Sequence, residues 1–414
     1  MTDLDSRSGG TFIPRNHQTG SREGVGPAGD PAAREASRER LVEPRVSSLE
    51  LFFDLVFVFA LTQVTAFIAS DPTWSGLGRG TMVLASMWWA WVCYSWLTNS
   101  VRAEEVGPAR FVIFGAMGAM LVTSLAVPGA FGADAATFAV AYFAVRVLHV
   151  ALYSLATRSN RDVQQAVLRL APGLLAGPVV LVAGALVGGP AHLALWAVAL
   201  VLDYAAPLLR GVAGLRVHAA HFVERHGLIV LIALGESIVA IGAGAAGLAL
   251  DTGVVVGALL ALALAAGLWW SYFDTVAPAA ERHLALRDDR ARAFQARDSY
   301  SYLHLPLVGG IILLAFGIKK VLPAPWSALS AVPAVALCGG IALHLLAHVA
   351  FRLRDDRTLS RPRLVAAVVA LALTPLAMRL PGLVSLAILV ALFAALGAIE
   401  VAEFGEFRRE VRAG

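Results

Sequence analysis

Two pairs of ionisable residues lie inside long apolar runs, where a charge costs free energy unless it is paired or lines a polar cavity. Glu50 and Asp54 lie four residues apart and therefore share one face of a predicted helix. Two carboxylates at this spacing fit a site for a cation or a proton. Glu50, nearer the end of its run, also fits an ordinary interfacial residue. We expect the functional role to lie with Asp54, because an idle charge costs more at greater depth.

The second pair combines Glu236 and Arg146, each near the middle of its own apolar run. The small neighbours Gly235 and Ser237 would let another helix approach Glu236 closely. Histidines aside, Arg146 is the only basic residue that the predicted spans place deep in the membrane. We therefore expect a Glu236–Arg146 ion pair with His149 close by. Such a pair fits a transport site, and it equally fits a lock between helices, since buried ion pairs often have no further role.

Histidines near helix ends form a third group, with His226 and His304 as its main members. Imidazoles that face carboxylates can relay protons near neutral pH, while hydrogen-bonded packing is the alternative for any single one. His344 and His348 have the i, i+4 spacing of metal ligands, but no third ligand lies nearby in sequence, so a metal stays an open question. Because no nucleotide loop, zinc signature or nucleophile elbow occurs, we expect no cofactor.

Most of these polar residues fall in the same half of their predicted helices, the cytoplasmic half. This asymmetry predicts a polar cavity that opens toward the cytoplasm. The residues that we expect to bind a substrate or an ion are Asp54, Glu236, Arg146, His149, Glu50, Glu224, His226, Asp274 and His304.

The elements that must position these residues are transmembrane helices. Apolar residues make up 58% of the 414 residues and charged residues only 15%, with a mean hydropathy of +0.71, whereas a soluble domain has about 25% charged residues. Each predicted helix is close to the roughly 20 residues that cross about 30 Å of hydrocarbon. The twelve predicted spans are 48–69, 80–98, 110–129, 135–157, 172–188, 191–209, 226–247, 252–274, 302–322, 328–351, 363–379 and 382–402.

The loop charges predict an orientation with both termini in the cytoplasm. From residue 34 onward, 25 basic residues fall on one side of the predicted membrane and four on the other, namely Arg79, Lys319, Lys320 and Arg379. A wrong helix count would reverse this bias midway along the chain, and no reversal occurs. Membrane topology therefore explains the positive net charge better than nucleic acid, which we do not expect as a partner.

Weak internal similarity leaves open a duplication of six helices. Trp88-Trp89-Ala90-Trp91 matches Trp269-Trp270-Ser271-Tyr272, and His149-Val150-Ala151 matches His348-Val349-Ala350. Chance similarity between apolar segments is the alternative. The predicted parts are a disordered cytoplasmic tail at 1–45, a first six-helix half at 46–210, a second half at 211–404 and a cytoplasmic tail at 405–414.

Several of the same polar residues carry a resemblance to the bacterial low temperature requirement protein A (LtrA) family. It rests on Ser48-Leu-Glu-Leu-Phe-Phe-Asp54-Leu-Val-Phe-Val-Phe59, on His221-Phe-Val-Glu-Arg-His226, on Gly235-Glu236-Ser237, and on Trp269-Trp270-Ser-Tyr-Phe-Asp274 and Tyr302-Leu-His304-Leu-Pro306. These motifs run from about residue 45 to 320. The resemblance implies a polytopic protein of the cytoplasmic membrane, linked by its name to growth in the cold, without a settled molecular activity.

Two functions fit these observations, and we favour the first. In the first, the protein is a transporter or channel in the lipid bilayer for a small solute or ion, with the proton as one candidate. In the second, it is a membrane enzyme acting on lipid or another apolar substrate, with Glu224, His226 and His304 as acid–base groups. The sequence determines neither the substrate nor the oligomeric state.

Overall fold

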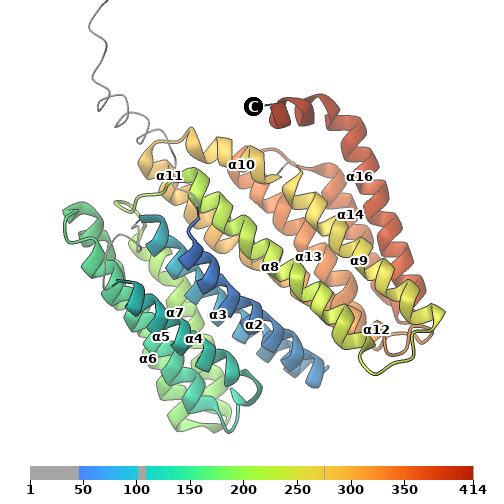
Figure 1. The fold of residues 1–414 in the computed structure, drawn as a ribbon, viewed down its shortest axis with the longest axis horizontal. Coiled ribbons are helices and arrows are strands. Elements are labelled where there is room, and N and C mark those ends of the chain that lie inside the picture. The colour runs from blue at the N-terminus through green and yellow to red at the C-terminus, as the bar shows by residue number, and fades with distance from the viewer. Residues whose placement is uncertain (1–45, 101–108, 275, 414) are drawn as a thin grey trace, which may run out of the picture. The chain divides into compact units, whose positions relative to one another are not determined.

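Helices build this protein, and their order follows the sequence prediction closely (Figure 1). The computed structural model describes residues 46–100, 109–274 and 276–413, with side chains up to residue 403. The first group of elements is α2 (Ser48–Ser70), α3 (Trp74–Ser100), α4 (Ala109–Leu125), η1 (Val127–Gly129), α5 (Ala135–Ala156), α6 (Arg161–Val187) and α7 (Gly189–Arg210). The second is α8 (Ala219–Ala245), α9 (Thr252–Phe273), α10 (Val276–Ala285), α11 (Asp289–Gln295), η2 (Ala296–Tyr302), α12 (His304–Val321), α13 (Ala331–Asp355), α14 (Arg361–Ala372), α15 (Thr374–Ala377) and α16 (Gly382–Ala413).

The described residues confirm an all-α polytopic membrane protein. Nine of their helices are long and apolar enough to cross a membrane: α2, α5, α6, α7, α8, α9, α12, α13 and α16. The other three predicted spans correspond to α3, α4 and α14, which fall short in length or apolar character, so the count of twelve stays a prediction. The predicted tail at 1–45 and the loop residue Arg102 lie outside the described residues.

Several predicted helix boundaries were wrong. The helix α8 begins at Ala219, seven residues before the predicted start, and α6 begins at Arg161 rather than at residue 172. Both helices start with polar turns, which apolar periodicity misses although their backbone is helical. The helix α16 likewise continues to Ala413, across the predicted tail at 405–414. Between α14 and α15 the helix is interrupted at Leu373, two residues before Pro375, which cannot donate a backbone hydrogen bond.

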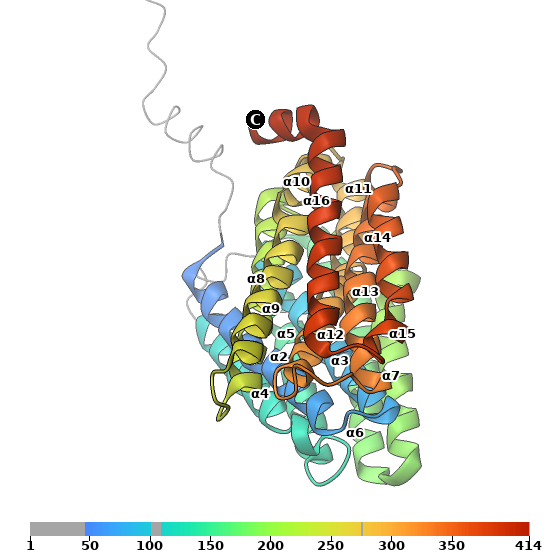
Figure 2. The same cartoon turned by 90° about the vertical axis from the view of Figure 1, so that its right-hand side faces the viewer.

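The helices α2 and α3 lie between the helices α4 to α7 and the helices from α8 onward (Figures 1 and 2). On one side α4, α5, α6 and α7 pack in order, and on the other α8, α9, α12, α13, α14 and α16 pack against one another. The helix α2 contacts α3, α4, α8 and α12. The helix α3 likewise contacts α5, α7, α8 and α12, so both helices join the two sides.

The most buried helices are α12 and α13. Their most apolar segments are 72% buried, against at most 50% for the other seven candidate spans. Gly310 and Gly340 permit this contact, since a Cβ on Gly310 would lie 2.4 Å from the Gly340 carbonyl oxygen. The centre of the second group is therefore a close helix pair whose histidines are fully enclosed.

Candidate functional site

A fully buried arginine, Arg225 of α8, holds both carboxylates of the first predicted pair. Its Nη1 lies 2.9 Å from Glu50 Oε1, and its Nη2 lies 2.6 Å from Asp54 Oδ1. The side chain of Arg225 is 0% exposed, and those of Glu50 and Asp54 are 8% and 2% exposed. Charge-assisted hydrogen bonds between such desolvated groups are the strong ones. The helices α2 and α8, which are far apart in sequence, are thus joined by one arginine that binds two carboxylates.

Local helix geometry places the two carboxylates. Ser47 and Glu50 form a capping box at the start of α2, in which Glu50 Oε2 accepts from the Ser47 amide at 2.9 Å. Asp54 follows one helical turn later on the same face. Glu50 therefore caps its own helix and binds Arg225 at the same time, so the interfacial and functional interpretations of this residue both apply.

Neighbouring side chains fix the orientation of the site. The Trp91 indole donates to Asp54 Oδ1 at 2.9 Å, and the Arg225 guanidinium donates to Thr98 Oγ1 at 2.9 Å. Asp54 Oδ2, by contrast, is buried without a hydrogen-bond partner among the described residues. Asp54 Oδ1 thus accepts hydrogen bonds from Trp91 and Arg225, whereas Oδ2 accepts none from the described residues.

The protonation of His221 follows from its two neighbours. Asn99 Nδ2 lies 3.0 Å from His221 Nδ1, and an amide nitrogen can only donate, so Nδ1 accepts. His221 Nε2 lies 3.1 Å from Glu50 Oε2, to which it donates. A neutral imidazole satisfies both contacts. The site then holds two carboxylates and one guanidinium, which leaves one net negative charge.

Glu236 forms a second site deeper on α8, and its predicted ion pair with Arg146 was wrong. Its Oε1 lies 3.3 Å from Lys319 Nζ of α12, and its Oε2 accepts from the Thr62 hydroxyl of α2 at 2.6 Å. Lys319 lies in the last turn of α12. The expected close approach of a helix at Gly235 is also absent, since nothing lies within 4 Å of a Cβ there.

Arg146 instead pairs with Asp203, in a network of the first helix group. Its Nη2 lies 3.2 Å from Asp203 Oδ1, whose other oxygen accepts from the Tyr142 hydroxyl at 3.0 Å. The Cys93 thiol lies 2.8 Å from Arg146 Nη1. His149 is buried nearby, and neither of its ring nitrogens has a hydrogen-bond partner among the described residues. This pair is electroneutral and joins α5 to α7, as a lock between helices would.

The remaining predicted residues divide between the site and its surroundings. His226 packs its ring edge-on against Trp91, at 4.9 Å between ring centroids, and His304 lies 5.2 Å from His226. Glu224 is exposed and accepts from the Val46 amide, and Asp274 is half-buried at the end of α9. Of the acid–base set expected for an enzyme, His226 and His304 are thus enclosed together, while Glu224 is exposed.

The sequence analysis missed three residues that contribute directly: Arg225, Trp91 and Lys319. Arg225 was assigned to a loop because the predicted helix began one residue too late to include it. Its position four residues after His221, on a helical face, is the signal that would have found it. His344 and His348 pack ring to ring, and the described residues contain no group of three or more His, Cys, Asp or Glu that could hold a metal ion.

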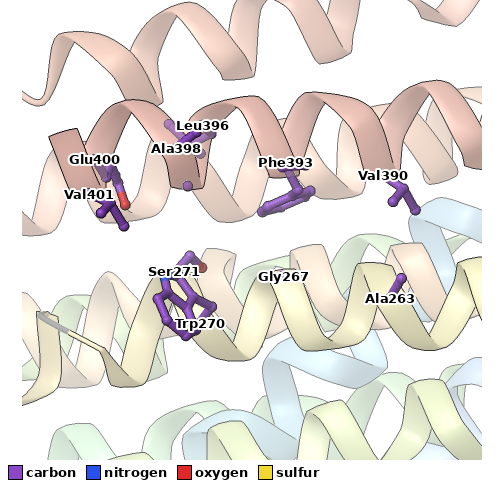
Figure 3. Close-up of a pocket in the computed structure, with 12 residues that line it drawn as sticks. Ala263, Gly267, Trp270, Ser271, Val390, Phe393, Leu396, Ala398, Glu400 and Val401 are labelled. Atoms are coloured by element: carbon purple, nitrogen blue, oxygen red, sulfur yellow. The ribbon is translucent and has the colours of Figure 1, made fainter.

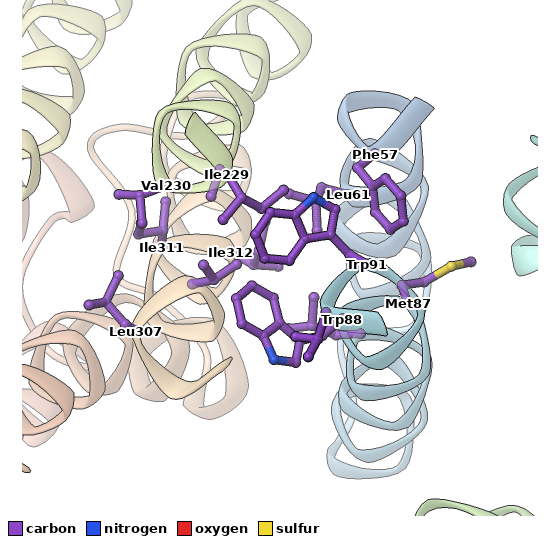
Figure 4. Packing of buried hydrophobic residues seen from close by; sticks show 14 of the residues in the cluster. Phe57, Leu61, Met87, Trp88, Trp91, Ile229, Val230, Leu307, Ile311 and Ile312 are labelled. Atoms are coloured by element: carbon purple, nitrogen blue, oxygen red, sulfur yellow. The ribbon is translucent and has the colours of Figure 1, made fainter. Parts of the chain in front are cut away.

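An apolar layer separates the two charged sites. Along α2, Asp54 and Thr62 are eight residues apart, about 12 Å, and along α8, Arg225 and Glu236 are about 16 Å apart. Figure 4 shows the packing between α2, α8 and α12 in this interval. Its buried members include Phe57, Leu61, Ile229, Val230, Ile311 and Ile312.

Comparison with known proteins shows the family of the chain. The family model described as bacterial low temperature requirement A protein (LtrA) matches residues 45–398. The chain belongs to this family. An uncharacterized protein of Rhizobium meliloti (strain 1021), RA0937, is 31% identical over 320 residues, which cover 74% of this chain and 77% of that protein. No solved structure matches the chain. The matched residues of the LtrA family include both charged sites and the apolar layer between them.

Proposed function

We propose that this LtrA protein is a transporter of the cytoplasmic membrane that moves a small solute or ion, coupled to one positive charge bound at the Glu50–Asp54–Arg225 site. The observation that carries the proposal is the arrangement on the α2–α8 seam. Two buried charged sites lie on the same helix pair, with sealed apolar packing between them. A site for a charged species and a barrier to its passage are the two parts that a transporter requires.

The charge of the first site supports coupling to a cation. Glu50 and Asp54 carry one negative charge more than Arg225 compensates, and uncompensated charge in the hydrocarbon region costs about 2.5–3.5 kcal/mol on insertion scales. One proton or one small monovalent cation removes this excess. Asp54 Oδ2, buried and without a partner among the described residues, is the atom that would receive it.

The apolar layer supports a transporter rather than an open channel. The residues Phe57, Leu61, Ile229 and Ile312 are each at most 4% exposed, so the packing leaves no aqueous route between Asp54 and Glu236. A hydrophobic constriction of this length opposes the passage of a hydrated ion. Passage then requires that α2 and α8 shift against each other, which alternately exposes each site.

The test uses inside-out membrane vesicles in which respiration generates a proton gradient, followed with a pH-sensitive dye. Sodium, potassium, lithium and a low-molecular-mass extract of cytoplasmic solutes serve as probes, added one at a time. At least one addition should dissipate the gradient with the wild-type protein. Asp54→Asn and Glu50→Gln should abolish this response, because each removes the excess charge.

Asp298→Asn is the matched control, since Asp298 pairs with Arg297 and Arg354 at the surface and should leave the response intact. The same response in Asp54→Asn as in wild type would contradict the proposal, and no response to any probe would exclude the proton as the coupled cation. The family name also leads us to infer a role in growth at low temperature. A deletion strain complemented with wild type, but not with Asp54→Asn, should then recover growth in the cold.

A further inference from the structure

The Glu50–Asp54–Arg225 site differs in its charge from other ion pairs between the helices. Three other buried acids each pair with one base: Asp203 with Arg146 at 3.2 Å, Glu236 with Lys319 at 3.3 Å, and Glu400 with Arg363 at 2.6 Å. Figure 3 shows Glu400 at one end of the groove of about 550 Å³ that α16 forms with α9. The Glu50–Asp54–Arg225 site instead joins two acids to one base, so a further base beside it decides its net charge.

His221 is that base. Its Nε2 lies 3.1 Å from Glu50 Oε2, and it precedes Arg225 by one turn of α8. Arg225 opposes a second positive charge here, whereas Glu50 and Asp54 favour one, and an imidazole beside a carboxylate ordinarily gains stability as the cation. An imidazolium would cancel the excess negative charge of the site. A cation would then have no charge left to neutralise at Asp54.

Asn99, in the last turn of α3, engages the other ring nitrogen of His221. Asn99 Nδ2 lies 3.0 Å from His221 Nδ1. An amide nitrogen at this position requires Nδ1 to accept, and an accepting Nδ1 carries no proton. An amide oxygen in its place would accept from an imidazolium. The orientation of one amide therefore decides whether His221 can be charged.

The backbone of His218, the N-cap residue of α8, fixes this orientation. The His218 amide donates to Asn99 Oδ1 at 2.9 Å, and the His218 carbonyl accepts from Asn99 Nδ2 at 3.0 Å. A flipped amide would set two donors against each other at the first contact and two acceptors at the second. The two hydrogens of Nδ2 thus point to the His218 carbonyl and to His221 Nδ1. Backbone groups whose roles cannot change hold the amide, independently of His221.

The clamp formed by Asn99 and the His218 backbone is enclosed and belongs to the same turn of α3 that binds the guanidinium. Asn99 and His221 are each 4% exposed. Thr98, next to Asn99, accepts from Arg225 Nη1 at 2.9 Å. The end of α3 therefore contacts both bases that α8 presents to Glu50.

A neutral His221 also directs a cation to one of the two carboxylates. It still donates to Glu50, whose oxygens then accept from His221, Arg225 and the Ser47 amide. Asp54 Oδ2, in contrast, accepts from none of the described residues. The excess negative charge is thus best available at Asp54 Oδ2, where no donor has to be displaced.

We propose that Asn99 is a positioning residue of the cation site: its clamp keeps His221 neutral, so that the site retains one negative charge and the coupled cation binds at Asp54. This inference rests on the proposed function, because it explains why the excess charge is left for a cation. Asn99 acts through His221 and does not itself contact Glu50 or Asp54 in the printed geometry of the site.

The first test measures the protonation of His221 in the purified full-length protein at neutral pH. The histidine rings are labelled with ¹⁵N, and the NMR signals absent from His221→Gln are those of His221. Wild type should show a neutral imidazole with its proton on Nε2. Asn99→Ser removes the donor and leaves room for a water that accepts from Nδ1, so His221 should become an imidazolium. Asn99→Asp, of nearly the same shape, places an acceptor at Nδ1 and should have the same effect.

Asn160→Ser is the matched control and should keep the wild-type signals of His221. Asn160 caps α6, where its side chain accepts from the Val163 amide at 3.3 Å, and serine is an equally good N-cap residue. An imidazolium in wild type would overturn the proposal, as would a neutral His221 in both Asn99 variants. These outcomes do not depend on any transport measurement.

The second test uses the Asp54-dependent vesicle response. Asn99→Ser should lose it, because the imidazolium leaves the site without net charge. Adding His221→Gln should restore it, since glutamine can donate to Glu50 but cannot take up a proton. A double variant as inactive as Asn99→Ser would overturn the proposal, because a purely structural defect is not repaired by His221→Gln. The same response in Asp54→Asn as in wild type would instead contradict the proposed function, and the NMR signals of His221 would still confirm or refute the clamp.

Discussion

Removing the Arg225 cation should destabilise the protein more than removing either of its anions. In Arg225→Met the aliphatic stem keeps its packing, but Glu50 and Asp54 remain at 8% and 2% side-chain exposure with no cation between them. Breaking a buried ion pair by deleting one partner costs about 3–5 kcal/mol. We expect a loss of this size, because water screens neither carboxylate effectively.

The charge count of the site predicts how second substitutions behave. The wild-type site carries one net negative charge, Arg225→Met carries two, and Asp54→Asn carries none. Asp54→Asn should therefore be as stable as wild type or more stable, although it should lose transport. Arg225→Met with Asp54→Asn and Glu50→Gln is neutral again and should recover most of the loss, since glutamine still completes the capping box of α2.

Apparent melting temperatures of the detergent-solubilised variants test this order. Because membrane proteins often unfold irreversibly, the ranking at one heating rate is the meaningful quantity. Arg354→Met is the control: its contact with Asp298 is 37% and 26% exposed, and such surface pairs contribute about 0–1 kcal/mol. An Arg225→Met variant as stable as Arg354→Met, or a triple variant less stable than Arg225→Met, would refute the reasoning from buried charge.

Two further predictions concern helix packing and the Arg146 network. Gly310→Ala should destabilise the protein by about 1–3 kcal/mol and so lower its apparent melting temperature, because the added Cβ would lie 2.4 Å from the Gly340 carbonyl oxygen. Gly235→Ala, with nothing within 4 Å, should leave that temperature unchanged, and equal effects of the two would contradict this packing. Arg146→Met with Asp203→Asn should keep the Asp54-dependent vesicle response, since this pair lies off the α2–α8 seam. Loss of that response would show that the pair takes part in transport.

The sequence predicted which residues would be buried and polar, but not how they pair. Asp54, Glu236 and Arg146 stood out because charge is rare in apolar runs, and that rule depends on composition alone. The pairing of Glu236 with Arg146 was inferred from depth. It was wrong because depth does not state which helix faces which, and Lys319 reaches Glu236 from a helix end.

The sequence by itself determined the class of the protein, the approximate position of its helices and the polar identity of its interior. These follow from local periodicity and from the cost of burying charge, which each segment expresses independently. Only the tertiary structure decided that Arg225 binds Glu50 and Asp54, that an apolar layer separates this site from Glu236, and that His226 of α8 meets His304 of α12. Such contacts join residues that lie far apart in the sequence. The rotation and register of their helices are fixed by packing between helices, which no single segment encodes.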